Sequence, residues 1–599
     1  FLFLLWDQYR LALRKIAAPI LFFATAVALA MGASSIQWMA PYQYLAKYSQ
    51  RLQHSEGHGL EWSSSWAMHS EELLSEVNPE FPGADLGGGP QTYWGQNYFK
   101  LNSEAVGVMA VALAVVALIV AGAPSIWFFA GLSVFVLLNA LGDSTPVFRL
   151  FYEFVPMVKK FRAPSMICFL FAFSWIVMAT RAIDVLAEAK SAGAQVLKRA
   201  TEPLRVLTII ASAYSIIALI GLVTGSSLLA GWASLVGNVL TADKVLAAAA
   251  NAGHVRAGFL FGAVVLWGLV GLFRARRKGM VGSTGVAGGL ALLAILPLWQ
   301  FDGRYVETVD PKPYYAERPI LALIRQNAPK EPYRVLNLPK TLNDNYLALH
   351  GIEELSPTAM HGNHLLLHDN FVGRHEPTPA LTNPAVLNLL NAVFLLSPQP
   401  VSQPGFTPVG QSGGLYLVRN DAALPRAAVF YQYEVNTDSA ATLARIRSAD
   451  FAYRSRLILD QPLPNLAPAP ADAAPIDFTP AHVIDWDVDH FTVECKAERD
   501  GILWLSENYY PAWRATDESG QSLPIYRADY TFRAVPIAAG SHRIAFDFHN
   551  AVFSQSVWLS LTCLTILIGG IVWSGRRRPS GRDHPAVTSP IFSQEGGTR

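Results

Sequence analysis

The sequence predicts an α-helical polytopic membrane protein with about eight transmembrane helices. A large extracytoplasmic domain, α/β followed by a β-sandwich, is inserted before the last helix. Three observations predict this fold: the composition, a series of long apolar runs, and the side on which lysine and arginine gather. Of the 599 residues, 52% are apolar and only 15% are charged, whereas soluble globular domains carry about 25% charged residues. Such a chain needs a bilayer as part of its solvent.

The apolar runs have about the length of a membrane span, which is roughly 17–25 residues for a helix. Seven of them belong to a membrane domain over 1–299, and the eighth follows the outer domain. The alternative is that a short run such as 126–141 is only a buried helix, which would invert the sidedness of everything after it. The eight runs cover 16–34, 104–122, 126–141, 165–181, 204–224, 255–273, 281–299 and 551–573.

Basic residues predict the orientation, because lysine and arginine gather in short cytoplasmic flanks. Four clusters fall on one side if all eight runs cross the membrane. We therefore expect both ends of this chain, including the tail 574–599, in the cytoplasm of a cell inner (plasma) membrane, with 35–103, 142–164, 225–254 and 300–550 outside. The clusters are Arg10, Arg14 and Lys15; Arg181, Lys190, Lys198, Arg199 and Arg205; Arg274, Arg276, Arg277 and Lys278; and Arg576, Arg577 and Arg578.

The segment from 300 to 550 predicts three successive parts. Helix-like stretches followed by short apolar strands indicate an extracytoplasmic α/β subdomain over 300–462. The proline- and alanine-rich stretch 463–479 indicates a linker with too few large side chains to pack a core. Alternation of apolar and polar residues is typical of antiparallel strands, and it predicts a β-sandwich subdomain over 480–550. The last helix, 551–573, follows.

The first outer loop, 35–103, is rich in aromatic and acidic residues. It predicts a short amphipathic helix over 66–77, then a glycine/proline turn and an aromatic patch at Tyr93, Trp94 and Tyr98. Tryptophan and tyrosine at span ends can simply form the interfacial belt, and the alternative is a substrate-binding surface. The candidate substrate-binding residues, together with an aromatic turn in the β-sandwich, are Trp66, His69, Glu72, Tyr93, Trp94, Tyr509, Tyr510 and Trp513.

The second outer loop, 142–164, carries cations on the side that the positive-inside trend leaves poor in them. Arg149, Lys159, Lys160 and Arg162 suit phosphate, since arginine offers a planar fork of donors and lysine a point charge. They are candidates for holding the phosphate of a lipid-linked substrate. The alternative is an interfacial helix whose basic residues reach up to the headgroups of membrane lipid.

Other patterns argue against several functions. His361, His364 and His368 would share a helix face, but no cysteine or matched carboxylate accompanies them, so we expect polar packing rather than a metal site. Asp485, Asp487 and Asp489 would share a strand face, which is more typical of a solvated surface than of calcium binding. Scattered basic residues exclude nucleic acid as an expected partner, and nucleotide-binding and hydrolase motifs are absent. No cofactor is expected, and a divalent cation stays open.

Two stretches resemble a known family. GDSTPVFRLFYEFVPMVKKFRAPS, which ends in Phe161, Arg162 and Pro164, is similar to a segment of the bacterial YfhO membrane-protein family. LSENYYPAWRATDESGQSLPIYRADYTFRAVPIAAGSHRIAFDF resembles the C-terminal signature of that family, with its Tyr-Tyr-Pro-x-Trp turn and closing Gly-x-His. SWAMHSEELLSEVNPEFPG with the following YWG resembles its long outer loop. The resemblance covers most of the chain.

The resemblance implies a glycosyltransferase of the C class (GT-C). Such an enzyme transfers a sugar from a polyprenyl-phosphate donor to an acceptor on the outer face, such as an envelope polymer or glycan. Lys159, Lys160 and Arg162 would hold the donor phosphate, Trp66, Tyr93 and Trp94 would face the sugar or prenyl chain, and the aromatic turn would orient the acceptor. The catalytic acid of such enzymes lies in an N-terminal outer loop. Because this chain opens at Phe1 inside an apolar stretch, we expect that residue in spans upstream of it and assign none here.

Two other functions are compatible with the same architecture. One is transport of a lipid-linked substrate, although no internal repeat of the kind found in transporters is apparent. The other is a non-catalytic envelope assembly protein whose β domain binds its partners, because the sequence holds no catalytic constellation that stands alone.

Overall fold

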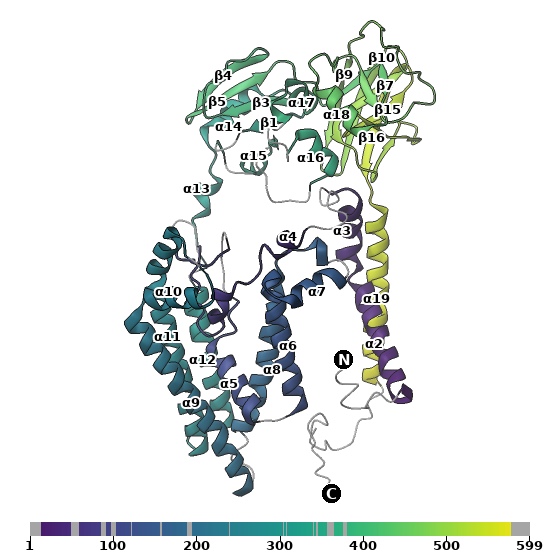
Figure 1. The fold of residues 1–599 in the computed structure, drawn as a ribbon. Coiled ribbons are helices and arrows are strands. Elements are labelled where there is room, and N and C mark those ends of the chain that lie inside the picture. The colour runs from purple at the N-terminus through teal and green to yellow at the C-terminus, as the bar shows by residue number, and fades with distance from the viewer. Residues whose placement is uncertain are drawn as a thin grey trace. The chain divides into compact units, whose positions relative to one another are not determined.

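The computed structural model contains two compact units, Phe1–Gln53 with Pro311–Arg599, and His54–Asp310 (Figure 1). Each unit is described by itself. The residues described are 13–49, 59–85, 91–97, 104–120, 123–155, 158–187, 194–238, 240–303, 305, 306, 308–338, 341, 342, 345–355, 364–374 and 380–576.

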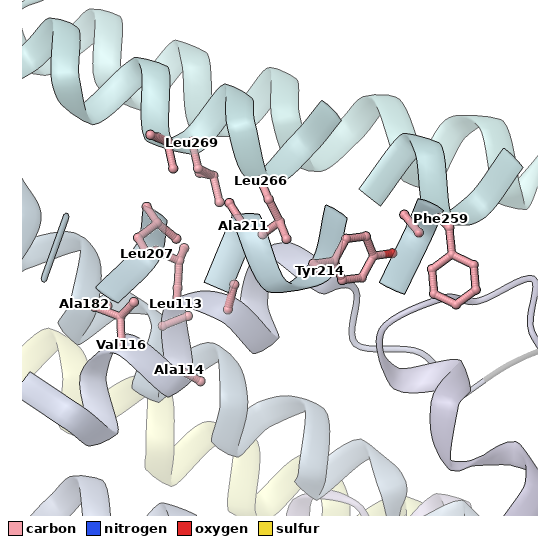
Figure 2. Packing of buried hydrophobic residues seen from close by; sticks show 14 of the residues in the cluster. Leu113, Ala114, Val116, Ala182, Leu207, Ala211, Tyr214, Phe259, Leu266 and Leu269 are labelled. Atoms are coloured by element: carbon pink, nitrogen blue, oxygen red, sulfur yellow. The ribbon is translucent and has the colours of Figure 1, made fainter. Parts of the chain in front are cut away.

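The unit His54–Asp310 is a bundle of apolar helices. Helix α8 packs on α5 and α6, and α11 packs on α9 and α12. Leucine, valine and alanine side chains of α5, α9 and α11 fill the space between them, among them Leu113, Leu207 and Leu266 (Figure 2). The helices are α5 (Val108–Val120), α6 (Pro124–Ala140), α8 (Cys168–Ala187), α9 (Ala194–Thr224), α10 (Ser226–Leu235), α11 (Ala242–Arg277) and α12 (Ser283–Asp302).

Every predicted apolar run coincides with a helix, but the helices differ in length. Within the described residues, four are long and apolar enough to cross a membrane: Pro164–Ala187, Pro203–Thr224, Ala242–Arg277 and Ala551–Ser574. A fifth results if α2 (Leu13–Ala33) and α3 (Ser35–Lys47), bent by 70°, form one broken span. The apolar helices Val108–Val120, Pro124–Ala140 and Ser283–Trp299 are shorter. The described part of the chain therefore has four or five helices of full membrane length beside three shorter ones.

The first helices belong with the last helix, α19 (Ala551–Arg576), and not with the other predicted spans. Small residues make the contact possible: a Cβ on Gly32 would lie 2.3 Å from the Cys563 sulfur. The Ser35 hydroxyl lies 3.0 Å from that of Ser560, and it donates to the Ser556 carbonyl oxygen at 2.9 Å. Small residues let helix backbones approach closely in membranes. The expected single membrane domain over 1–299 is thus wrong in its grouping, because 13–47 pairs with α19.

Within the predicted α/β subdomain lies a five-stranded sheet in the order β2-β1-β3-β5-β4. Strand β1 pairs in parallel with β2 and β3, and β5 runs antiparallel to β3 and β4. Its core holds Ile324 of α14 (Pro319–Asn327) against Phe394 and Leu417 of the sheet. The strands are β1 (Arg334–Asn337), β2 (Glu353–Leu355), β3 (Ala392–Ser397), β4 (Phe406–Ser412) and β5 (Leu415–Asn420); short helices α13 (Pro311–Tyr315), α15 (Tyr346–Leu349), α16 (Leu366–Val372) and α17 (Pro384–Leu389) surround them.

The remaining strands form one eleven-stranded sheet whose two halves enclose a common core. In its central strand β11, Leu503 and Leu505 face that core, whereas Ile502 and Trp504 face a second core with α18 (Ser439–Arg447). Burial on both faces explains the continuous apolar run in this strand. The strands are β6 (Ala427–Phe430), β7 (Tyr433–Val435), β8 (Leu457–Leu459), β9 (Thr479–Trp486), β10 (His490–Ala497), β11 (Gly501–Asn508), β12 (Trp513–Thr516), β13 (Ser522–Leu523), β14 (Tyr526–Ala528), β15 (Phe532–Ile537) and β16 (Gly540–Phe548).

Two of the expected boundaries need correction. The β subdomain begins at β6, not at 480, because β6 pairs with both β9 and β11. The stretch 463–479 is no free linker: the Ala469 N–H donates to the Tyr433 carbonyl oxygen at 2.8 Å, and the Gln432 amide donates to the Ala474 carbonyl oxygen at 2.8 Å. The stretch is therefore held to the β subdomain by hydrogen bonds of its backbone and by the buried side chain of Leu463, although most of its side chains are too small to form a core.

Candidate functional site

Four segments that were predicted to face one side meet at one end of the helix bundle in His54–Asp310. The first outer loop touches the second where the Asp143 backbone N–H donates to the Ser64 hydroxyl at 3.1 Å. It touches α11 where the Asn251 amide donates to the Glu80 carbonyl oxygen at 2.8 Å. It also shares a cavity with Asp302, at the end of α12.

A cavity of about 140 Å³ lies beneath this loop. Its walls are apolar except for the carboxylates of Glu80 and Asp302. An apolar cavity of comparable volume admits a benzene molecule, so the space suits a group the size of one six-membered ring or a short stretch of hydrocarbon. The lining residues are Val77, Pro79, Glu80, Ala105, Gly107, Val108, Gly258, Phe261, Gly262, Val265, Pro297, Leu298, Phe301 and Asp302.

Two glycines of α11 set the shape of the cavity. A Cβ on Gly258 would lie 2.1 Å from the Asn78 side-chain oxygen and 3.0 Å from the Glu80 Cγ. A Cβ on Gly262 would lie 2.2 Å from the Tyr214 hydroxyl. Since real Cβ atoms do not approach so closely, the loop and α9 can rest on α11 only because both positions lack a side chain. Glu80 is itself 8% exposed, so the loop holds its carboxylate in a largely dry environment.

The predicted aromatic and acidic residues of the first loop lie mainly in its own core. The Tyr93 hydroxyl donates to the Glu72 carboxylate at 2.7 Å, and the Trp94 indole donates to the Phe81 carbonyl oxygen at 2.7 Å. Burial, and then the adjacent Glu72 carboxylate, raises the pKa of Tyr93. His69 begins a 3₁₀ helix, Ser70–Glu76, where an amphipathic α-helix over 66–77 was expected. Tyr93, Trp94 and Glu72 are fully buried, so they stabilise the loop and do not offer open faces to a ligand; Tyr98 lies outside the described residues.

The four predicted phosphate-binding cations are held separately along the second loop. The Arg149 Nε donates to the Asp143 carbonyl oxygen at 3.0 Å, and the Lys159 ammonium pairs with the Glu153 carboxylate at 3.0 Å. Arg162 stacks on Trp66, with its guanidinium carbon 3.7 Å from the ring centroid. The structure thus brings together two predicted site residues, Arg162 and Trp66. Arg149, Arg162 and Lys160 are exposed, and none of the four cations lines the cavity.

The predicted acceptor-binding turn lies where the β sheet meets α3. The Tyr510 ring centroid lies 4.8 Å from that of Tyr48 and 6.3 Å from that of Tyr44. Trp513 packs against Phe548 with ring centroids 5.4 Å apart. Tyr509 is half-buried, and burial raises the pKa of its hydroxyl, with Asp460 as the next cause. Tyr510 therefore connects the sheet to the end of α3, Trp513 packs within the sheet, and all three residues of the turn are half-buried.

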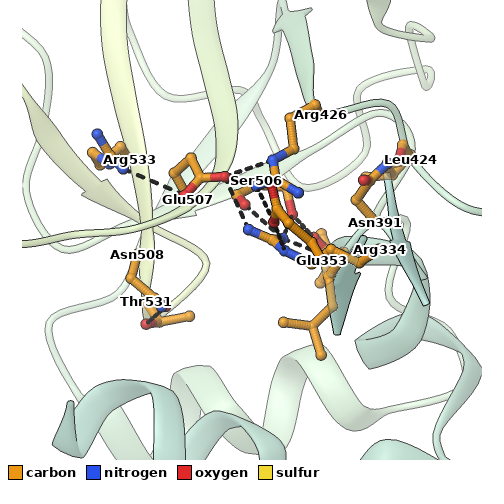
Figure 3. Close-up of polar contacts among 12 residues, drawn as sticks. Arg334, Glu353, Asn391, Leu424, Arg426, Ser506, Glu507, Asn508, Thr531 and Arg533 are labelled. Carbon is orange, nitrogen blue, oxygen red and sulfur yellow. Dashed lines mark hydrogen bonds and ion pairs between the residues drawn. The ribbon is translucent and has the colours of Figure 1, made fainter. Parts of the chain in front are cut away.

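A buried ion network joins the two subdomains, and the sequence alone gave no sign of it. Glu507 at the end of β11 accepts a hydrogen bond from Arg334 at 2.9 Å, and it forms ion pairs with Arg426 at 2.6 Å and with Arg533 at 3.5 Å (Figure 3). Glu353 of β2 contacts Arg334 at 3.2 Å and Arg426 at 2.6 Å. Three guanidinium groups thus share two carboxylates. The network fixes the α/β sheet to the larger sheet and is structural in character.

The histidine prediction can be tested only in part, because His361 and His375 lie outside the described residues. Among the residues that are described, no group of three histidine, cysteine, aspartate or glutamate side chains could hold a metal ion. Burial, and then the nearby Arg334 guanidinium, lowers the pKa of His368 to about 4, so its ring is neutral near pH 7. The aspartates that were considered for calcium lie on and just after β9. There Asp485 lies 3.5 Å from His490, and His490 pairs with Asp547 at 2.7 Å.

Comparisons were made with protein-family models, with curated proteins and with solved structures, and none of them matches this chain. A function can therefore be proposed only from the residues and geometry of this chain. Of its two acidic residues, Asp302 follows a predicted span directly in the sequence, whereas Glu80 lies in the middle of a long loop where no motif singles it out. The sequence feature that could have indicated Glu80 is the pair of prolines at 79 and 82, because proline restricts the backbone on either side of this residue.

Proposed function

We propose that this chain is a polytopic glycosyltransferase of the C class in a cell inner membrane, which transfers a sugar from a polyprenyl-phosphate donor to an envelope polymer or glycan on the outer face. The observation that carries the proposal is the cavity at the end of the helix bundle. Its apolar walls suit a prenyl chain or the apolar face of a sugar, and its carboxylates can accept a proton. The resemblance to the YfhO family supports the same function.

In this proposal all eight apolar helices cross the bilayer. Large apolar side chains on their surfaces support it, among them Phe22 at 77%, Trp299 at 79% and Trp558 at 71% exposure. Such side chains would be covered by lipid. The shorter α5, α6 and α12 can be accommodated by local thinning of the bilayer. Helix α11, with 36 residues at about 1.5 Å each, is longer than the hydrocarbon core is thick, and its N-terminal part supports the outer loop.

The reaction would join an acceptor hydroxyl oxygen to the anomeric carbon of the donor sugar. The bond between that carbon and the phosphate oxygen breaks, and polyprenyl phosphate leaves with the bonding electron pair. The acceptor proton passes to the Glu80 or the Asp302 carboxylate. The exposed cations Lys160 and Arg162, which belong to the same unit as the cavity, would offset the charge on the leaving phosphate.

The test is a transfer assay on membranes that contain the full-length protein, with a radiolabelled polyprenyl-phosphate sugar. Glu80→Gln and Asp302→Asn keep the size of each side chain and remove its charge. We expect one of them to lower the transfer rate by roughly 100-fold or more, as loss of a general base does. Asp243→Asn is the matched control, because Asp243 is an exposed carboxylate at the start of α11 outside the cavity.

Undiminished transfer by the double variant would overturn the assignment of these carboxylates. If the wild-type protein moves the labelled donor across sealed vesicles without forming a product, the transporter alternative holds instead. If it binds envelope material without either reaction, the assembly alternative holds.

A further inference from the structure

Helix α7 (Pro146–Phe154) packs against α6 and runs across the end of that helix (Figure 1). One face of α7 is turned to the bundle: Phe148 and Tyr152 are buried, and the Phe151 ring lies 5.7 Å from that of Phe135. Side chains four positions apart share a face of a helix. A second face of α7, formed by residues 150 and 154, therefore points away from the first.

That second face is apolar and has no cover. Leu150 is 59% exposed and Phe154 is 78% exposed. Exposed apolar side chains continue along the chain, with Phe161 at 61% and Met166 at 76% exposure. The next one, Phe169, is 68% exposed and lies at the start of α8. Helix α8 lies in Pro164–Ala187, one of the four helices long and apolar enough to cross a membrane. The apolar surface of the loop thus leads directly into that of a candidate span.

Cations alternate with these apolar residues. Arg149 lies one position before Leu150, and Lys160 and Arg162 flank Phe161. All three are exposed, whereas Lys159 has a carboxylate partner in Glu153. Large exposed apolar side chains interleaved with basic ones are the mark of a helix that lies in a membrane interface. A surface of this kind in water would be an aggregation site.

We propose that residues 146–155 and 158–166 form an interfacial anchor that binds anionic phospholipids of the outer leaflet. Leu150, Phe154, Phe161 and Met166 enter the boundary between headgroups and acyl chains, and Arg149, Lys160 and Arg162 contact the headgroup phosphates. The occupant is a lipid surface, because a soluble anion would explain the cations but not the apolar residues between them. The anchor rests on the membrane-spanning part of the proposed function and not on sugar transfer. It would hold the cations in the plane where the phosphate of a lipid-linked donor also lies.

The test is a depth measurement on the full chain reconstituted in vesicles, with or without phosphatidylglycerol. Spin labels are placed by Phe154→Cys and Phe161→Cys; the three native cysteines are buried. Val488→Cys is the control, since Val488 is 90% exposed on the turn between β9 and β10. We expect the labels at 154 and 161 to collide with dissolved oxygen more than with a water-soluble nickel chelate, and the label at 488 to do the reverse. Labels at 154 and 161 that behave like the one at 488 would overturn the anchor.

A second variant tests the headgroup contact. Lys160→Glu with Arg162→Glu reverses two charges, and we expect it to make the label at 154 shallower in vesicles that contain phosphatidylglycerol, with little change in zwitterionic ones. An equal depth in both kinds of vesicle, with and without the charge reversal, would contradict the preference for anionic lipid. Neither result depends on whether the protein transfers a sugar, so failure of the anchor and failure of the enzyme proposal are distinguishable.

Discussion

Glu507→Gln is expected to destabilise the joint between the five-stranded and the eleven-stranded sheet by about 3–5 kcal/mol, the usual cost of removing one partner from a buried ion pair. With glutamine at 507, Arg334 and Arg426 would still pair with the Glu353 carboxylate. Arg533 would lose its ion pair with Glu507. Arg426 and Arg533 are almost fully buried, and each has guanidinium nitrogens without an acceptor. Water cannot readily replace the lost charge there.

Hydrogen exchange in the full chain measures this effect locally. The expected cost corresponds to roughly a 150- to 5000-fold rise in the opening of peptides from β11 and β15, because about 1.4 kcal/mol is a factor of ten. Glu494→Gln is the matched control, since Glu494 is exposed on β10 of the same sheet. Unchanged protection of β11 in Glu507→Gln would show that the network contributes little.

The same network predicts a loss of stability in acid. Burial alone would raise the pKa of Glu507, but Arg426, Arg334 and Arg533 together lower it below its ordinary value. A carboxyl group with a lowered pKa in the folded state contributes stability that is present above its unfolded pKa and is lost as the pH falls through the folded one. The exchange difference between the wild type and Glu507→Gln should therefore shrink below about pH 4.

Gly258→Val is expected to lower the rate of the proposed sugar transfer by roughly 100-fold, because it changes the shape of the cavity. Its side chain would occupy the space of the Asn78 side-chain oxygen, which lies 2.1 Å from the position of a Cβ. Asn78 in turn donates to the Val255 carbonyl oxygen at 3.0 Å and accepts from the Glu80 N–H at 3.2 Å. The loop must move, and Glu80 moves with it. A displacement of about 1 Å at a reacting group can cost roughly 100-fold in rate.

The matched control is Gly271→Val on the same helix. Gly271 is exposed, and a Cβ there meets no atom within 4 Å, so the control has the same change in helix propensity without the clash. The transfer rate should fall in Gly258→Val and stay near the wild-type rate in Gly271→Val. Equal rates in both variants would mean that the close contact of loop and helix is not needed for function.

The helices could be predicted from the sequence because the apolar periods are local. Each of the eight runs forms a helix, and the alternating stretches beyond 480 form strands. The grouping of these elements could not be predicted. Nothing in the apolar run of α2 shows that Gly32 will meet Cys563 more than 500 positions away. The strand β6 was also missed as part of the large sheet, since its run of small apolar residues has no alternation.

The candidate site was predicted only in its general position. The aromatic and basic residues of the two loops predicted a binding surface there. Tyr93 and Trp94 are instead fully buried in the core of the first loop. Glu80 lines the cavity because Asn251 and Gly258 hold the loop against α11. Such contacts join segments about 170 positions apart, and residue type alone does not disclose them.

The most direct test of the central claim is photo-crosslinking with a polyprenyl-phosphate sugar that carries a diazirine in the prenyl unit next to the phosphate. Mass spectrometry of the full-length protein in membranes would locate the attachment sites. The proposal predicts crosslinks to peptides that contain Val108, Phe261 or Leu298, which line the cavity, and their loss in Gly258→Val but not in Gly271→Val. Crosslinks confined to α2 and α19, with the cavity peptides unlabelled in the wild type, would contradict it.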